Sequence, residues 1–248
     1  VGESDYHEIK VNVYIVDILN GCGTYGHPFQ IDSAEEMVVI ADYIRTGTAG
    51  NGWKIRSDKS FLEEDGSKNE LHTKDATYCS EYTYNGTSWE NSASDEIPKD
   101  AMKEYMRNAY YQIVKDITLD DSFCGLGFES TSAFRGVIVG KENENGKYPT
   151  ITLRNSSLTS QYASHGLINN SYGSVVMNLN IKLSKVQDTN LNENNKTEAT
   201  VNNYFGGVMG QILGGDNFIE NVTVTSDENF LNLTDNYNYL VPVGGYVG

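Results

Sequence analysis

Hydrophobic and polar residues alternate along much of this chain, in short stretches separated by Gly, Asn, Asp and Ser. Residues 8–18 place Ile9, Val11, Val13 and Ile15 on one face, which predicts a strand that ends at the turn Asn20–Gly21. The same alternation predicts further short strands over residues 29–31, 110–119, 134–140 and 150–153. A chain of short strands with few helical stretches is expected to fold as a mainly β protein.

Two stretches follow the period of a helix instead. Ser33 and Glu36 form a capping box before apolar residues at helical spacing, and Gly47 is suited to end the helix, so residues 34–46 are predicted to be helical. A second helix is predicted after Pro98, a residue suited to a first helical turn. Its apolar stripe consists of Met102, Tyr105, Met106 and Ala109.

A β-hairpin is predicted around Asn85–Gly86, because this dipeptide suits a two-residue type I′ turn. Such a turn pairs Tyr84 with Thr87 and Tyr82 with Trp89. Tyr78, Tyr82, Tyr84 and Trp89 then share one face. This aromatic face is either an exposed binding patch or a small core that packs on one of the helices.

A glycine-anchored phrase recurs in the C-terminal half, at Gly166, at Gly206–Gly207 and at Gly244–Gly245, with a spacing of about 40 residues. After the first two copies, a second apolar phrase begins near Gly173 and Asn217. Repeats of this length indicate a stacked β-solenoid rather than a sandwich. The inward-facing residues of its parallel strands are predicted to be Ile138, Ile151, Leu153, Leu179, Ile181, Val208, Val222 and Val224.

The order of these motifs resembles the GLUG-like-repeat surface proteins of gut Gram-positive bacteria. The similar segments are PFQI at 28–31, SAEEMVVIADYI, YYQIVKDITL, AFRG at 133–136, PTITLRN, GLI with GSVVMNLNI, and GGVMG with FIENVTVT. The resemblance covers most of residues 28–248 except 48–97. It implies a right-handed parallel β-helix with a helical cap, in adhesin-like proteins of which some bind immunoglobulins.

This organisation predicts two parts of one continuous unit. Residues 1–110 supply an N-terminal strand and a cap with two short helices and the hairpin-bearing insertion 48–97, while residues 111–248 supply the rungs and a protruding polar loop at 187–203. The chain starts within a strand pattern and stops at a repeat phrase. It is therefore expected to be a piece of a longer protein whose export signal and wall anchor lie elsewhere.

The composition of the chain limits the classes of binding partner. A formal net charge of −16 disfavours nucleic acid and direct contact with anionic membranes, since both would repel the chain. No apolar run approaches the ~18 residues of a membrane span. Cys22, Cys79 and Cys124 are widely separated, which disfavours a zinc site and fits one disulfide with a free thiol as well as three thiols.

No nucleophile, metalloprotease or phosphate-binding motif is present. Asp116, Asp120 and Asp121 surround a predicted strand end, where carboxylates either bind Ca²⁺ or only terminate the strand; no other cofactor is expected. The prediction is a non-enzymatic, extracellular module of a bacterial cell surface. It would bind a host protein such as immunoglobulin or mucin, or a glycan, and the alternatives are a carbohydrate-active β-helix enzyme (polysaccharide lyase or glycosidase) that uses these carboxylates and a structural stalk.

Overall fold

The computed structural model is mainly β, with 47% of residues in strands and two α-helices in the part of the chain that it describes. The residues described are 19–48, 54–57, 79–127, 130–157, 164–187, 204–228, 231–232 and 243–248. The predicted strand at 8–18, the ring of Tyr78 and nearly all of the loop 187–203 lie outside these ranges.

Helix α1 (Ala34–Thr46) has the predicted bounds and the predicted caps. Ser33 Oγ accepts a hydrogen bond from the Glu36 amide at 3.3 Å, and the Glu36 carboxylate accepts one from the Asp32 amide at 2.8 Å. Gly47 ends the helix in the left-handed conformation, with φ 75°. Local sequence therefore determines this helix at both ends.

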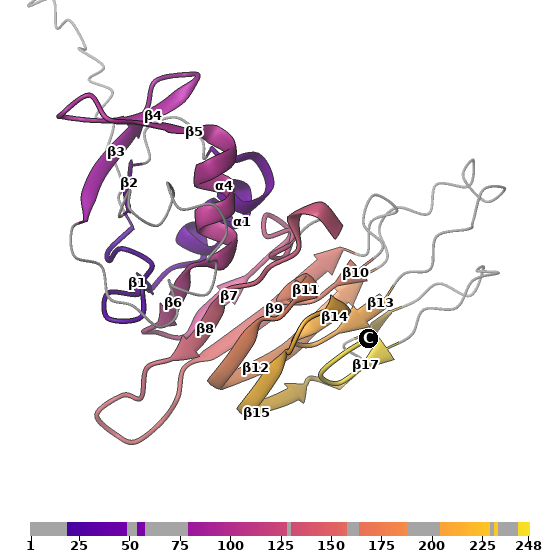
Figure 1. The fold of residues 1–248 in the computed structure, drawn as a ribbon. Coiled ribbons are helices and arrows are strands. Elements are labelled where there is room, and N and C mark those ends of the chain that lie inside the picture. The colour runs from indigo at the N-terminus through magenta and orange to yellow at the C-terminus, as the bar shows by residue number, and fades with distance from the viewer. Residues whose placement is uncertain are drawn as a thin grey trace, which may run out of the picture.

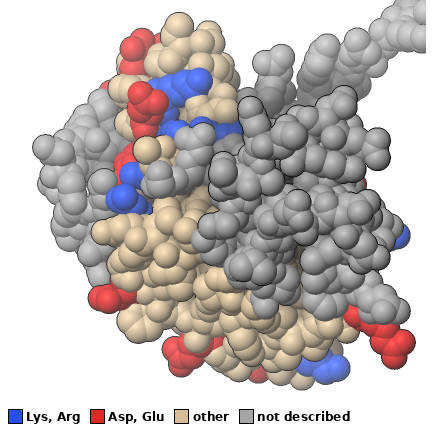
Figure 2. Space-filling model, turned by 90° about the vertical axis from the view of Figure 1, so that its right-hand side faces the viewer, with Lys and Arg blue, Asp and Glu red and all other residues tan. Residues whose placement is uncertain are grey.

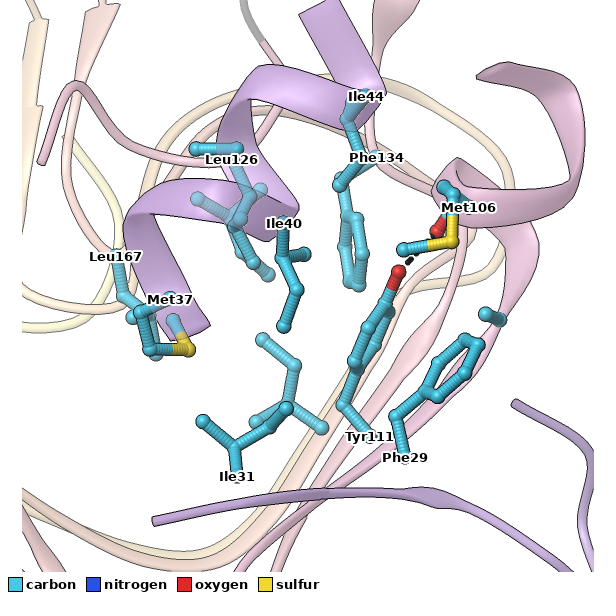
Figure 3. Packing of buried hydrophobic residues seen from close by; sticks show 14 of the residues in the cluster. Phe29, Ile31, Met37, Ile40, Ile44, Met106, Tyr111, Leu126, Phe134 and Leu167 are labelled. Carbon is cyan, nitrogen blue, oxygen red and sulfur yellow. Dashed lines mark hydrogen bonds between the residues drawn. The ribbon is translucent and has the colours of Figure 1, made fainter. Parts of the chain in front are cut away.

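Helix α4 (Lys99–Asn108) follows Pro98 and buries the predicted side chains of Met102, Tyr105 and Met106. The two helices pack on each other and close one end of a stack of parallel strands (Figure 1). Met37 and Ile40 from α1 point into the same core as Leu126, Phe134 and Leu167 (Figure 3). One hydrophobic cluster thus runs from the helices into the strands.

The largest sheet consists of parallel strands in the order β1-β6-β8-β12-β9-β7, with β15 and β16 also paired to β12. Its strands are β1 (Phe29–Ile31), β6 (Tyr110–Ile113), β7 (Ile117–Leu119), β8 (Val137–Gly140), β9 (Thr150–Ser157), β12 (Val175–Gln187), β15 (Phe218–Ser226) and β16 (Leu231–Asn232). β8 and β9 pair with successive parts of one edge of β12, so two short strands lie opposite one long strand.

Two smaller parallel sheets complete the stack. One has the order β10-β13-β17, with bounds Ser164–His165, Tyr204–Gly206 and Val243–Gly244; the other pairs β11 (Ile168–Tyr172) with β14 (Met209–Gly214). A short 3-10 turn, η1 (Ser130–Ser132), precedes β8. Successive strands run side by side from the helical end toward the C-terminus (Figure 1).

The glycine phrases of the sequence stack in register. His165 pairs with Phe205, Phe205 with Val243, and Gly206 with Gly244. A Cβ atom on Gly206 would lie 1.9 Å from the carbonyl oxygen of Met209, so only glycine fits at this position. Residues about 40 positions apart in the sequence are therefore paired in adjacent parallel strands.

Parallel pairing and the predicted inward-facing residues are confirmed. The side chains of Ile138, Ile151, Leu153, Leu179, Ile181 and Val208 are buried. Val222 and Val224 are partly buried and pack against the same cluster. These two belong to β15, which has a paired neighbour on one edge only among the described strands.

The predicted strand 110–119 is wrong as a single element. It is divided into β6 and β7, which pair with β8 and β9 respectively. Between them the Val114 amide donates to the Ile31 carbonyl, and Asp116 Oδ1 accepts from the Thr150 amide at 2.7 Å. The break between β6 and β7 lies where the chain passes from its pairing with β1 and β8 to its pairing with β9.

The parallel strands also bury polar residues, which the hydrophobic–polar pattern of the sequence did not predict to be buried. Asn169 and Asn170 of β11 donate through their side-chain amides to the carbonyls of Cys124, at 2.6 Å, and Gly127, at 3.1 Å. The Ser171 hydroxyl donates to Oδ1 of Asn217. Each contact joins neighbouring layers, so these buried groups keep hydrogen-bond partners.

Candidate binding surface

The insertion between α1 and α4 forms a four-stranded antiparallel sheet that packs against the helices. Its order is β2-β3-β4-β5, with bounds Lys54–Ser57, Ser80–Tyr84, Ser88–Asn91 and Glu96–Pro98. The side chains of Ile55, Tyr82, Trp89 and Ile97 are buried, which identifies the inner face. This sheet lies at the helical end of the stack (Figure 1).

The register of the hairpin differs from the prediction. Tyr84 pairs with Trp89 and Tyr82 with Asn91, so four residues separate the last paired positions, and the fourth of them, Ser88, begins β4. Asn85 Oδ1 accepts hydrogen bonds from the amides of Thr87, at 3.0 Å, and Ser88, at 2.9 Å. This side-chain turn replaces the expected two-residue turn and moves the pairing by two residues.

The predicted aromatic patch is corrected, because its two central rings are internal. Tyr82 and Trp89 are each 1% exposed, which makes them core residues rather than surface for a partner. The Trp89 indole N–H donates to the Gly47 carbonyl at 2.9 Å, and its ring packs on those of Tyr43 and Tyr84, with centroids 5.3 and 5.4 Å away. Tyr84 is half-buried, and Tyr78 lies outside the described residues.

Burial in this aromatic core keeps the phenol of Tyr43 protonated. Burial raises the pKa of Tyr43 well above its usual value, so this side chain stays neutral. A neutral phenol among buried rings has a packing role. The aromatic residues on the inner face of the sheet therefore pack it against α1. They support the outer face of the sheet, which is exposed.

That opposite face carries a polar pocket of about 770 Å³. Its wall contains the Lys54–Glu81 ion pair, with Thr83 exposed between the strands. The pocket is lined by Lys54, Cys79, Ser80, Glu81, Thr83, Tyr84, Asn85, Glu90, Asn91, Ser92, Ala93 and Asp95. The sequence analysis did not single out Glu81 or Thr83. Alternation along β3 puts both residues on the face opposite Tyr82, but the pocket that they line depends on the tertiary fold.

Internal hydrogen bonds fix the rim of the pocket. Asn91 donates to Asp95 Oδ2 at 3.0 Å, and Asn91 Oδ1 accepts from the Asp95 amide at 2.9 Å. Lys54 is neutralised by Glu81, while Glu90 and Asp95 add further negative charge. A wall of carboxylates, amides and hydroxyls is suited to a hydroxylated or cationic ligand, because such groups replace the hydrogen bonds lost on desolvation.

A disulfide ties this sheet to the rest of the fold. Cys22, fully buried beside β1, is bonded to Cys79, which lines the pocket; their Cα atoms are 6.0 Å apart. Cys124 is a free, half-buried thiol. The structure therefore selects one disulfide with one free thiol from the two arrangements that the sequence left open.

Of the three carboxylates considered as a calcium or catalytic site, Asp116 and Asp120 accept hydrogen bonds from within the chain. Asp120 Oδ1 accepts hydrogen bonds from the Ser122 amide, at 2.9 Å, and hydroxyl, at 2.6 Å. The Ser122 hydroxyl and amide hold the pKa of Asp120 below its usual value. Asp116 caps the Thr150 amide, Asp121 is exposed, and within the described ranges no three His, Cys, Asp or Glu side chains are grouped to hold a metal ion.

Comparison with family models, curated proteins and solved structures gives no match for this chain. Neither of the described helices is long and apolar enough to cross a membrane.

Proposed function

We propose that this chain is a non-enzymatic recognition module of a bacterial cell-surface protein, which binds an extracellular host protein or glycan. The observation that carries the proposal is the polar pocket on the outer face of the four-stranded sheet, backed by a rigid aromatic core. A preformed, rigidly supported pocket loses little entropy when a ligand binds.

We also propose that the scaffold is a right-handed parallel β-helix. The in-register parallel pairing of successive repeats, in all three parallel sheets, supports this architecture. The resemblance to GLUG-like-repeat surface proteins supports it independently, and it also suggests immunoglobulin or mucin as partners. In this proposal the stacked strands are the support, and the antiparallel sheet at their end carries the specificity.

Two variants with the same substitution test the site. Thr83→Arg places a long cation over the pocket, and Thr118→Arg makes the same change at an exposed Thr in the middle of β7. Binding is measured against immunoglobulin, mucin and a glycan array. We expect Thr83→Arg to weaken binding at least tenfold and Thr118→Arg to leave it unchanged.

Other outcomes assign a different role. Equal binding by both variants would move recognition to another surface, and a chain that binds no probe would favour a stalk. Release of reducing ends from a polysaccharide would favour the carbohydrate-active enzyme. The full chain is used because deletion of residues 48–97 would remove Trp89 from the core and Cys79 from its disulfide.

A further inference from the structure

Arg135, which lies directly before β8, has no protein partner for its charge. Among the described residues it forms no ion pair, and its half-buried side chain donates no hydrogen bond to the protein. Arg107 differs, although its carbonyl accepts a hydrogen bond from the Arg135 amide at 2.8 Å, because its guanidinium is paired with Glu104. The two arginines thus occupy neighbouring layers, and only Arg107 is neutralised.

Tyr172 holds the Arg135 side chain in a defined position. Arg135 Cζ lies 4.9 Å from the centroid of the Tyr172 ring, which attracts the cation. A Cβ atom on Gly214 would lie 2.8 Å from Tyr172 Cε2, so the ring also rests against the backbone of the next layer. Arg135 Nε is buried, whereas the two terminal nitrogens are not, and they have no protein acceptor among the described residues. The guanidinium is therefore oriented before a ligand binds, next to a tyrosine that is 45% exposed.

The sheet surface that begins two residues after Arg135 is apolar. Val137 faces outward, because its neighbour Ile138 points into the core. It pairs with Tyr110 on one side and with Val175 on the other. The Tyr110 ring packs on that of Tyr25, with centroids 5.8 Å apart, and Tyr25 is 59% exposed. A ligand at Arg135 therefore meets a single unpaired cation beside aromatic and aliphatic side chains.

The backbone amides around this pair already bond to neighbouring layers. The Tyr172 amide donates to the Phe134 carbonyl at 2.9 Å. The Gly173 amide donates to the Gly214 carbonyl at 3.0 Å. These amides are not available to pair with a peptide strand, so recognition here depends on the guanidinium and the ring. An acidic sugar suits both, because its carboxylate accepts two parallel hydrogen bonds from an arginine and its C–H groups pack on an aromatic ring.

The charge of the whole chain limits the charge of such a ligand. A net charge of −16 repels polyanions. Charged side chains are scattered in the view of Figure 2, with uncharged surface between them, so no broad basic patch appears there to hold a polyanion. A single carboxylate is repelled much less, because exposed charges more than ~8 Å apart are largely screened at physiological ionic strength. A sugar with one carboxylate is therefore favoured over a polyuronate.

We infer that Arg135 and Tyr172 form a second binding site, which takes the carboxylate of a terminal acidic sugar on a glycan. The terminal nitrogens of Arg135 bind the carboxylate, and the Tyr172 ring orients the guanidinium and packs on the sugar. Neither residue lines the polar pocket of the four-stranded sheet. The inference therefore goes beyond the proposed function and can be tested separately from it.

The test compares two probes that differ in charge. One is the methyl glycoside of a sialic acid, a sugar with a single carboxylate, and the other is its methyl ester, which has the same ring without the charge. Binding to the full chain is followed by NMR titration. We expect the acid to bind at least tenfold more tightly than the ester, with the largest shifts at the amides of Tyr172 and Gly173. This comparison uses the original chain, so it does not depend on how a variant folds.

Two variants that remove the same charge serve as a matched pair. Arg135→Gln removes the guanidinium of the site, and Arg154→Gln removes one from an exposed residue of β9. Arg135→Gln should weaken binding of the acid at least tenfold, and Arg154→Gln should leave it unchanged. Arg135→Lys keeps the charge but cannot donate two parallel hydrogen bonds, so it should restore only part of the binding. Thr83→Arg, which covers the pocket, should not affect binding of the acid.

Three results would overturn the inference. The first is equal binding of the acid and its ester, or an equal loss in Arg135→Gln and Arg154→Gln. The second is loss of acid binding in Thr83→Arg with full binding in Arg135→Gln, which would place the acidic sugar in the pocket and support the proposed function alone. The third is a peptide with a free C-terminal carboxylate that binds Arg135 as tightly as the acidic sugar, which would assign the site to a protein partner.

Discussion

The side-chain amide of Asn221 donates a hydrogen bond to Oδ1 of Asn178 at 2.8 Å, and both residues have left-handed backbone conformations. They occupy equivalent places in successive repeats, between the pairs Met177–Glu220 and Leu179–Val222. The two asparagines therefore carry the same bend from one strand to the next. Asn is suited to this place because it tolerates positive φ and bonds its neighbour in the stack.

The first prediction concerns this ladder. Asn178→Ala removes the acceptor of this hydrogen bond. It also places alanine, which tolerates positive φ less well than asparagine, at this position. The substitution should therefore destabilise the fold by about 1–3 kcal/mol. Asn178→Asp keeps an acceptor and the tolerance for positive φ, and should cost less. Denaturant unfolding of the two variants measures the difference, and equal losses would exclude a role for the hydrogen bond.

The second prediction compares one repeat position in two layers. Gly207 donates its amide to the Gly245 carbonyl, and a Cβ on Gly207 would lie 2.4 Å from that oxygen, whereas a Cβ on Gly245 meets no atom within 4 Å. Gly207→Ala should therefore lower the free energy of unfolding by roughly 1–3 kcal/mol. Gly245→Ala, the same change without a stacked neighbour, should have little effect on the melting temperature.

The third prediction separates core from surface in the insertion. Trp89→Ala removes a buried ring and should cost about 3–5 kcal/mol of stability. Thr83→Ala, at an exposed site on the neighbouring strand, should leave stability within about 0.5 kcal/mol of the original chain. Chemical unfolding followed by tyrosine fluorescence distinguishes them, and a stable Trp89→Ala variant would contradict the packing role.

The fourth prediction concerns the disulfide. Cys22 and Cys79 are separated by 57 residues, so the bond restricts a long loop of the unfolded chain. Cys22→Ser together with Cys79→Ser should destabilise the fold by about 2–4 kcal/mol. Reduction of the original chain should give the same loss, and its absence would mean that the sheet is held by packing alone.

The fifth prediction concerns acid stability. The folded state holds the pKa of Asp120 below its usual value of 3.8, mainly through the Ser122 hydroxyl. A depressed carboxyl pKa stabilises the fold above the unfolded pKa, and this contribution disappears as the pH falls through the folded pKa. Asp120→Asn should thus be less stable than the original chain at pH 6, and the difference should shrink below pH 3.8.

A charge-matched variant controls for the loss of a carboxylate. Asp121→Asn removes the same charge from the adjacent residue, which is exposed. It should not reproduce the pH-dependent loss. A difference between Asp120→Asn and the original chain that stays constant from pH 6 to pH 3 would show that the side chain acts by shape alone.

The local sequence was sufficient to predict the two helices and the period of the repeat. Ser33, Glu36 and Gly47 determine the ends of α1 because capping involves only neighbouring backbone groups. The spacing of Gly206 and Gly244 predicted the parallel register, since stacked strands need the same small residue at the same turn. The prediction for the hairpin failed by two residues because Asn85 uses its own side chain to close a longer turn.

Only the tertiary structure decided which face of each element is internal when both faces carry polar or aromatic residues. Tyr82 and Trp89 become core because α1 lies behind their sheet, and this contact joins residues far apart in the sequence. Asn169 and Asn170 are polar residues, yet they are buried in the folded chain. They can be buried because the carbonyls of Cys124 and Gly127, from another part of the chain, accept hydrogen bonds from their side-chain amides. The sequence by itself determined the helices, the strand-rich class and the repeat period, because these depend on local conformation and periodic burial. The pocket and the disulfide were decided by distant segments that fold against one another.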